Sequence, residues 1–487
     1  MVLVGLVAVW IVIGPADAAA PVVSPGSVLV VRSSANLHEA LAAQPTLRFG
    51  SSPPAGSTVI HVDDHRHFQR ITGFGAAMTD TSAWLIQDGL TGAVRTALYD
   101  DLWGPVGADM TFLRIPMGAT DFTVHGRPYS YDDLPRGQTD PNLRHFSIAH
   151  DEAYIIPAIH AALARNPRLA MLANPWSVPG WMKANDALDN SHHSGVLLHA
   201  DLGPFAQYFV KFLEAYAVAG IEIGAITPQN EPGNATQYPG MELPAAREAR
   251  LIGSWLKPAL AAAGLRPKIY GNDQGWSRDG TAFTHRLGTS AERRAIAGFA
   301  WHCYFGSPLV MSAQHAATPQ WDEIVNECAP GIIPFPVSEV MISSVREWAS
   351  TVALFNIAED THGGPVQPPN HGCPGCEPLA TVNSQTNSFK LSRSFYELAQ
   401  MSRFVRPGAV RIGSENFVTY NYTRPGVNFY GAGLDDVALH NPDGSIVLVT
   451  YNNSRQPISF TVDWKGRYFR YTLPSHATAT FVWNARS

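Results

Sequence analysis

The stretch "IGAITPQNEP" (223–232) joins a buried strand to a cluster of polar residues. Residues 223–227 are apolar or small, and Gln229, Asn230 and Glu231 follow almost directly. A strand of this kind normally ends in turn-forming residues. An amide and a carboxylate placed there instead indicate that Glu231 is a candidate functional residue, and they raise the question of its partner.

The segments on either side predict an alternation of strands and helices. "PFAQYFVKFLEAYAVAG" (204–220) and "PAAREARLIGSWLKPALAAAG" (244–264) carry apolar residues three and four apart, which is typical of amphipathic helices. Eight short apolar runs resemble strands: 71–80, 110–118, 168–176, 223–231, 267–273, 297–305, 333–341 and 351–360. Eight strand–helix units predict an α/β fold, a closed (β/α)₈ TIM barrel. A doubly wound open sheet is the alternative, although no Gly-rich phosphate loop follows the first run.

The hydrophobic period changes near both ends of the chain. From about residue 409 onward, short segments alternate apolar and polar residues between turn signals such as "NPDGS"; one of these segments is "FVTYNYTR" (417–424). The stretches 27–35 and 57–64 share this pattern. We therefore expect an antiparallel β-sandwich side domain built from both chain ends, with boundaries 21–66 and 408–487 around a barrel at 67–407.

Composition and charge narrow the class of protein. The chain has 487 residues, is 45% hydrophobic and has a formal net charge of −6. We expect no nucleic-acid partner, because no long basic run is present. Residues 1–20 are apolar and then small, which predicts a secretory signal peptide or an anchor, and hence a secreted or extracytoplasmic protein. No later stretch approaches the ~20 apolar residues of a spanning helix, so we expect no stable membrane insertion of the mature chain.

Four cysteines allow two disulfides in three pairings. The motif "HGCPGC" (371–376) also fits a metal or redox-active thiol site. Its surroundings are rich in Pro and Gly, which favours a disulfide that closes a loop. We expect Cys303 to pair with Cys328, and Cys373 to pair with Cys376, if the protein is exported.

Catalytic groups of a (β/α)₈ barrel lie at the C-terminal ends of its strands. The polar and aromatic residues that follow the predicted strands are Asp80, Asp121, Asn174, Trp176, Asn230, Glu231, His302, Tyr304 and Glu339. Two carboxylates facing each other beside aromatic rings are what cleavage of a glycosidic bond needs. This pattern predicts Glu231 as the acid and Glu339, on the predicted seventh strand, as its partner. The chemistry needs no cofactor, and we expect none.

Seven segments, in order along the chain, resemble motifs of glycoside hydrolase family 30, the glucosylceramidase-like enzymes. They are "QRITGFGAAMTDTSAWL" (69–85), "LRIPMGATDFT" (113–123), "NPWSVPGWMK" (174–183), "ITPQNEP" (226–232), "HCY" (302–304), "SEV" (338–340) and "FYELAQMSRFVRPGAVRIGS" (395–414). The resemblance runs over roughly residues 25–487. It implies a retaining β-glycosidase on a (β/α)₈ barrel with a fused β-sandwich.

The resemblance also implies roles for individual residues. Glu231 matches the acid/base and Glu339 the nucleophile. Asp80, Trp176 and Asn230 match positions that hold the sugar, and His302 and Tyr304 match residues flanking the nucleophile. Arg114 is expected to pair with a catalytic carboxylate, or else to bridge within the barrel. A core histidine at 302 and a helix cap at Asp80 are the structural alternatives.

Two departures bear on specificity. Ser338-Glu339-Val340 stands where relatives usually have Thr-Glu-Ala, and Phe355-Asn356 stands where they have Trp-Asn. These changes leave the mechanism unaffected but weaken the assignment to glucosylceramide.

The first functional hypothesis is a secreted retaining β-glycosidase acting on β-glucosides, with glucosylceramide as a candidate. A β-1,6-glucanase, a β-xylosidase or a β-fucosidase on the same scaffold stays open. A catalytically inactive carbohydrate-binding barrel is the alternative from another class. The partner is then a carbohydrate or glycolipid substrate. For a retaining enzyme we expect the two catalytic carboxyl groups to lie about 5–5.5 Å apart.

Overall fold

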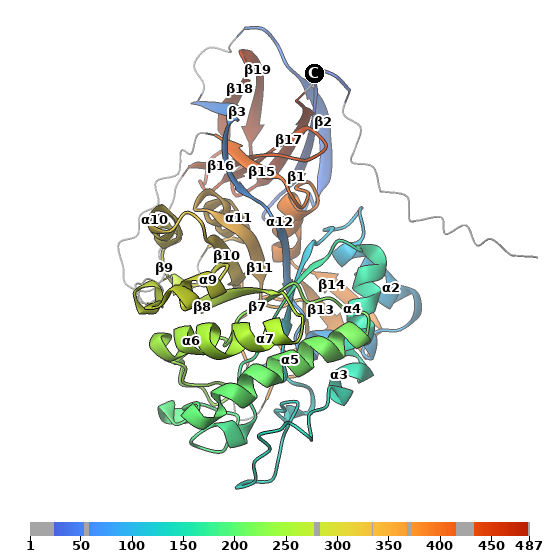
Figure 1. The fold of residues 1–487 in the computed structure, drawn as a ribbon. Helices are drawn as coiled ribbons and strands as arrows, with labels where there is room; N and C mark the ends of the chain where they lie inside the picture. The colour runs from blue at the N-terminus through green and yellow to red at the C-terminus, as the bar shows by residue number, and fades with distance from the viewer. Residues whose placement is uncertain are drawn as a thin grey trace, which may run out of the picture.

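The computed structural model describes residues 24–52, 58–276, 283–333, 335–367, 372–414 and 433–485. Figure 1 shows two parts, a barrel ringed by helices and a β-sheet domain that packs on two of these helices, α11 (Val337–Arg346) and α12 (Arg393–Ser402). The predicted signal segment 1–20 and the predicted strand 417–424 lie outside the described residues.

Eight parallel strands close the barrel in the order β10-β11-β4-β5-β6-β7-β8-β9. Their bounds are β4 (Gly73–Ala77), β5 (Phe112–Pro116), β6 (Ala170–Asn174), β7 (Ala225–Ile226), β8 (Lys268–Trp276), β9 (Gly298–Gly306), β10 (Asp322–Glu327) and β11 (Ala349–Leu354). The short strand β7 pairs with β6 and β8 on its two sides. The predicted (β/α)₈ barrel is therefore confirmed.

The seventh strand lies elsewhere than predicted. β10 covers "DEIVNE" (322–327), whereas the run assigned to this strand, 333–341, mostly forms the start of helix α11 (Val337–Arg346). Only Ile324 and Val325 of β10 are apolar, so the strand gives a weak hydrophobic signal. In α11 the apolar residues Val337, Val340 and Met341 recur at helical spacing, and the prediction of a strand there was wrong.

Helices cover the outside of the barrel (Figure 1). They are α1 (Asp80–Gln87), α2 (Gly92–Trp103), α3 (Ala149–Ala153), α4 (Ile155–Arg165), α5 (Leu202–Val218), α6 (Ala245–Leu251), the π-helix η5 (Ile252–Leu256), α7 (Lys257–Ala262), α9 (Ser290–Ala295), α10 (Leu309–Ala317), α11 and α12 (Arg393–Ser402). The predicted helices at 204–220 and 244–264 correspond to α5 and to α6-η5-α7. A small sheet of β12 (Ala358–Asp360), β13 (Ala380–Asn383) and β14 (Ser388–Leu391) follows β11.

Both chain ends build the second domain, as predicted. Its nine strands follow the order β19-β18-β3-β15-β16-β17-β20-β1-β2. They are β1 (Ser27–Ser33), β2 (Ala42–Arg48), β3 (Thr58–Arg70), β15 (Val410–Gly413), β16 (Leu434–His440), β17 (Ser445–Asn452), β18 (Ile458–Trp464), β19 (Arg467–Leu473) and β20 (Thr478–Asn484). All neighbours are antiparallel except β3 and β18, which are parallel.

Aromatic rings fill the core of this domain. Trp464, Phe469, Phe481 and Trp483 are nearly fully buried, and Phe49 packs on three of them at centroid distances of 5.3 to 5.8 Å. The long strand β3 pairs with β18 through its first half and with β15 through its second half. It therefore links the two sides of the domain and leads directly into the barrel.

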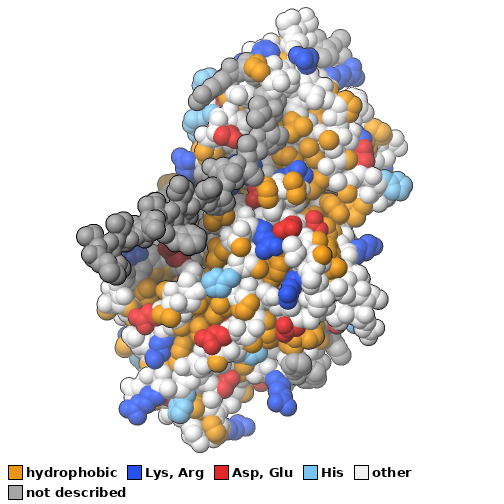
Figure 2. Space-filling model, turned by 90° about the vertical axis from the view of Figure 1, so that its right-hand side faces the viewer, with side chains coloured by type: hydrophobic (Ala, Val, Ile, Leu, Met, Phe, Trp, Pro, Cys, Tyr) orange, Lys and Arg blue, Asp and Glu red, His pale blue; other side chains and the backbone are white. Residues whose placement is uncertain are grey.

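The surface carries both signs of charge. On the face shown in Figure 2, Lys and Arg side chains are interspersed with Asp and Glu side chains. Among the described residues, none of the helices combines the length and the apolar character that crossing a bilayer requires.

Candidate active site

Two carboxylates meet at the C-terminal mouth of the barrel. Glu327 is the last residue of β10, and Glu231 follows β7. Three atoms lie within 4.8 Å of one another: one carboxylate oxygen of Glu231, one of Glu327 and a ring nitrogen of His302. Both side chains are largely buried, at 16% exposure for Glu231 and 7% for Glu327.

His302 lies between these carboxylates. Its Nδ1 is 3.0 Å from Glu231 Oε1 and 3.5 Å from Glu327 Oε1, and its Nε2 is 2.9 Å from Asp273 Oδ1. Burial alone would lower the pKa of His302, but three surrounding carboxylates raise it to about 10. His302 is therefore a cation at neutral pH.

Arg114 provides a second buried cation. Its guanidinium pairs with Glu327, donates to Asn230 Oδ1 at 2.7 Å and lies 4.5 Å from the centroid of the Trp176 ring. Arg114 is fully buried at the inner end of the mouth. Arg114 thus pairs with a carboxylate at the barrel mouth, that of Glu327.

Glu231 sits in a strained backbone position. Its φ is +44°, and its N–H donates to the Asp273 carbonyl at 3.1 Å. Oε2 accepts a hydrogen bond of 2.7 Å from Asn234. Burial would raise the pKa of Glu231, but the hydrogen bond and charge of His302 outweigh it and the pKa is lowered. Glu231 is thus ionised in the resting site.

Glu339 does not face the barrel mouth. It lies in the first turn of α11, is 1% exposed, and its Oε2 accepts a hydrogen bond of 2.7 Å from Asn453 of the β-sandwich domain. Its neighbour Ser338 contacts Thr478 of the same domain at 2.6 Å. The placement of Glu339 opposite Glu231 was therefore wrong, because the strand that carries the partner is β10 and not 333–341.

Aromatic side chains line the mouth beside Glu327. Trp176 stacks on Phe355 with a centroid distance of 6.1 Å, and Phe122 packs edge-on to Phe355 at 5.6 Å. Tyr304 donates to Glu327 Oε1 at 2.8 Å. Burial and the charge of Glu327 raise the pKa of Tyr304, so its hydroxyl remains a donor. Trp176, Tyr304 and Phe355 thus lie together at the barrel mouth, and their roles in binding substrate stay predictions.

Asp121 lies near this group, after β5. Burial, and then the charge of Glu327, raise its pKa to about 7. Among the described residues, Oδ1 of Asp121 is buried without a hydrogen-bond partner. A buried carboxyl oxygen of this kind is a suitable partner for a sugar hydroxyl.

Asp80 and Asn356 form hydrogen bonds with residues other than Glu231 and Glu327. Asp80 accepts hydrogen bonds from the Val124 N–H at 2.7 Å and the Tyr154 hydroxyl at 2.6 Å. Asn356 Oδ1 accepts from Ser82 at 3.0 Å. These hydrogen bonds do not connect the side chain of Asp80 or that of Asn356 to Glu231 or Glu327. Asp80 thus holds the backbone at Val124, and its role in binding sugar stays a prediction.

Three residues of the site were missed from the sequence. Glu327 was not recognised because β10, which it ends, is mostly polar and was not predicted as a strand. Asp273 binds His302, Asn174 and Asn326, and its place at the end of the predicted strand 267–273 was the available signal. Tyr238 comes from a loop without a pattern, yet burial and the charges of Glu231, Asp121 and Glu327 raise its pKa.

The spacing of Glu231, His302 and Glu327 would also suit a metal ion. Both ring nitrogens of His302 face carboxylates, and Arg114 pairs with Glu327. A His302 protonated on both ring nitrogens has no lone pair for a metal ion, so the cluster does not fit one.

Both predicted disulfides are present, Cys303–Cys328 and Cys373–Cys376. The first joins β9 to the residue after β10, and its cysteines directly follow His302 and Glu327. The second closes a tight loop, and both of its cysteines pack against the aromatic group of Trp176 and Phe355.

We expect the Cys303→Ala/Cys328→Ala double variant to lose about 3 kcal/mol of unfolding free energy, because the bond closes a loop of 25 residues. Urea unfolding measures this. The Cys373→Ala/Cys376→Ala variant is the control and should lose much less, since its bond spans three residues. Equal losses would contradict the loop argument.

The raised pKa of His302 predicts a pH dependence of stability. The unfolded pKa is near 6.5 and the folded pKa about 10. The stabilisation by protonated His302 is therefore complete below pH 6.5 and disappears progressively up to about pH 10. Unfolding free energies over this range should fall more steeply for the wild type than for His302→Asn. His315→Asn is the control and should keep the wild-type slope; a parallel curve for His302→Asn would refute the prediction.

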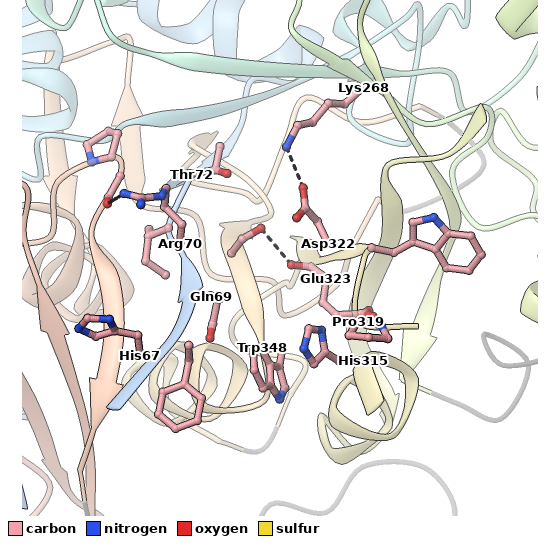
Figure 3. Close-up of a pocket in the computed structure, with 16 residues that line it drawn as sticks. His67, Gln69, Arg70, Thr72, Lys268, His315, Pro319, Asp322, Glu323 and Trp348 are labelled. Atoms are coloured by element: carbon pink, nitrogen blue, oxygen red, sulfur yellow. Dashed lines mark hydrogen bonds and ion pairs between the residues drawn. The ribbon is translucent and has the colours of Figure 1, made fainter. Parts of the chain in front are cut away.

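A different cavity, of about 760 Å³, lies at the opposite end of the barrel, where the strands begin (Figure 3). Trp348 stacks there on His315 at 3.6 Å, and Lys268 pairs with Asp322 at 2.7 Å. In this fold the N-terminal end contributes to stability and the C-terminal end carries the chemistry. We therefore place the active site at Glu231 and Glu327.

Comparisons with known proteins agree with this architecture. The model of the glycosyl hydrolase family 30 TIM-barrel domain matches residues 71–266, and that of the family 30 beta sandwich domain matches residues 408–481. An endo-1,6-beta-D-glucanase of Neurospora crassa is 34% identical over 83% of this chain and 84% of that protein. The endo-1,6-beta-D-glucanase neg1 of Aspergillus fumigatus is 31% identical over 92% of this chain and 93% of its own.

More distant relatives share the same fold. The lysosomal acid glucosylceramidase of Mus musculus is 26% identical over 87% of this chain and 83% of that protein. The crystal structure of SrfJ from Salmonella typhimurium covers 94% of this chain and 99% of its own, with a TM-score of 0.83 and 23% identity, and supports the fold alone. With both domains matched, and relatives above 30% identity over most of its length, the chain belongs to glycosyl hydrolase family 30 and is an O-glycosyl hydrolase.

Proposed function

We propose that the protein is a retaining endo-β-1,6-glucanase, with Glu327 as nucleophile and Glu231 as acid/base. The observation that carries the proposal is the pair Glu231 and Glu327, which share His302 within 4.8 Å. Inverting enzymes keep their carboxyl groups about 6.5–9.5 Å apart to admit a water molecule, whereas retaining enzymes hold them closer. The choice of substrate rests on relatives described as endo-1,6-beta-D-glucanases.

In the first step Glu327 attacks the anomeric carbon while Glu231 gives its proton to the leaving oxygen. The electron pair of Glu327 forms the new C–O bond, and the pair of the broken bond stays with the protonated leaving group. Arg114, Tyr304 and His302 hold Glu327 in place. Trp176 and Phe355 supply apolar faces for the sugar.

In the second step Glu231 takes a proton from water, which attacks the same carbon and releases Glu327. The lowered pKa of Glu231 keeps it ionised, so it is able to accept this proton. The first step requires Glu231 to be protonated, so a low pKa favours activity on the acidic side of neutrality. Two inversions at one carbon return the β configuration.

Glucosylceramide is the second candidate substrate, supported by the mouse relative. Phe355 in place of the tryptophan expected from the resemblance weakens this candidate. We also infer that the protein is exported, because two disulfides are typical of oxidising compartments.

A hydrolysis screen tests the proposed substrate. β-1,6-glucan, glucosylceramide and the aryl β-glucoside, xyloside and fucoside are offered to the same preparation, and products are separated by size. We expect β-1,6-glucan to be cleaved at internal bonds into short oligosaccharides. Release of glucose alone from chain ends, or cleavage of glucosylceramide only, would overturn the endo-glucanase proposal.

A further inference from the structure

A second cavity has Glu231 in its wall, whereas Glu327 is not among the described residues that line it. It encloses about 420 Å³, and its lining includes Glu231 and Asn234 from the loop after β7, Gln274 from β8 and Phe305 from β9. The volume lies in the range typical of small-ligand sites. Trp176, in contrast, lies against Arg114, which pairs with Glu327. A saccharide that crosses the catalytic pair would therefore have one part in each region.

The hydrogen bonds of Glu231 determine which of its oxygens faces the cavity. Oε1 is held by His302 at 3.0 Å, whereas Oε2 accepts a bond from the exposed Asn234 at 2.7 Å. Because Asn234 lines the cavity, Oε2 is the oxygen placed to protonate a leaving group there. The cavity is thus on the side of the bond from which the leaving sugar departs.

Phe305 presents an aromatic face at this cavity. Along β9, His302 and Tyr304 point towards the catalytic carboxylates, so alternation directs Phe305 to the other side. A side chain at Gly275 would come within 3.4–3.5 Å of Phe305 Cβ and Cδ2, which shows that Phe305 packs directly over this glycine. Phe305 nevertheless remains 60% exposed, far more than the other aromatic residues of the mouth.

Glu248 of α6 adds a polar group to the same cavity. It is 2% exposed, and its Oε1 accepts a hydrogen bond of 3.0 Å from the Asn272 N–H. Burial raises the pKa of Glu248 to about 8, so its carboxyl group is mostly protonated at neutral pH. A protonated carboxyl group donates a hydrogen bond, and sugar hydroxyls are good acceptors.

We propose that this cavity binds the glucosyl residue on the leaving-group side of the scissile bond, with the exposed ring of Phe305 as its stacking platform. Apolar sugar C–H groups pack on the ring, and Asn234, Gln274 and Glu248 offer partners for hydroxyls. The inference rests on the proposed function, because only a saccharide leaving group needs such a site. An endo-acting enzyme must hold sugar on both sides of the cleaved bond.

Two substrates that differ only in the leaving group test the site. β-1,6-linked glucan places a sugar in the cavity, whereas the β-glycosyl fluoride of the same sugar places a single fluoride there. For Phe305→Ala we expect kcat/KM on the glucan to fall about tenfold or more, where tenfold corresponds to 1.4 kcal/mol. The value for the fluoride should stay within about twofold of the wild type, and Phe305→Trp should restore activity on the glucan.

Val218→Ala is the matched control, because Val218 is an apolar residue with 90% exposure at the end of α5. It should leave both substrates unaffected, and thermal melting of each variant verifies folding. Equal losses on both substrates, or no loss on either, would overturn the role of Phe305. If the wild type cleaves the fluoride but not the β-1,6-glucan, the proposed substrate fails instead. The Phe305 comparison is then made on whichever β-linked saccharide the wild type does cleave.

Discussion

Replacing Glu327 with alanine is expected to lower kcat by roughly 10⁴-fold or more on every β-glycoside, whatever its leaving group. Without this carboxylate no glycosyl-enzyme can form, and the buried cations Arg114 and His302 lose one of their partners. A good leaving group does not compensate, because the missing group is the nucleophile and not the acid. Steady-state rates on an aryl glycoside and on the natural glycan measure the effect.

Azide identifies the face from which Glu327 attacks. In Glu327→Ala a small anion can occupy the vacated space and attack the β-glycoside directly, giving the α-glycosyl azide. Glu327→Gln and Glu339→Gln form a matched pair, since each replaces a buried carboxylate by an amide of similar shape. Glu339→Gln should retain activity because Glu339 contacts Asn453 between the domains. An inactive but folded Glu339→Gln, beside an active Glu327→Gln, would restore the assignment made from the sequence.

The sequence predicts the fold well because most barrel strands are strongly apolar. The runs at 110–118 and 168–176 contain β5 and β6, whose residues are almost all buried. β10 is different because Asp322, Glu323, Asn326 and Glu327 leave only two apolar residues. The sequence of a polar strand that ends at the barrel mouth resembles that of a loop. The apolar run at the start of α11 is therefore taken as the seventh strand instead of β10.

Only those site residues that lie in or directly after a recognisable strand could be predicted from the sequence. Glu231, His302 and Tyr304 were found because they follow or lie within apolar runs, and strand ends meet at one mouth. Asp80 also follows a strand, and the resemblance implies that it holds sugar. Its hydrogen bonds to Val124 and Tyr154 depend on how the loop after β5 folds back, which no local pattern encodes.

Replacing Glu231 with alanine should affect the two chemical steps differently. Loss of the acid is expected to slow cleavage of unactivated glycosides by roughly 10²–10⁴-fold. A 2,4-dinitrophenyl glycoside needs little protonation, so Glu327 should still form the glycosyl-enzyme at a substantial rate. Water then lacks its base, and the intermediate accumulates. We expect a burst of dinitrophenolate equal to the enzyme concentration, followed by slow turnover, and mass spectrometry should find the sugar on Glu327.

Azide then distinguishes the two glutamates. In Glu231→Ala it attacks the glycosyl-enzyme from the face that Glu231 vacated, so the product is the β-glycosyl azide, the anomer opposite to that from Glu327→Ala. Glu242→Gln is a suitable control, because Glu242 lies on the same loop but bonds to Asn190 and His193. It should show neither burst nor rescue. Swapped anomers would mean that the two roles are reversed. The same anomer from both variants would exclude a double displacement between Glu231 and Glu327.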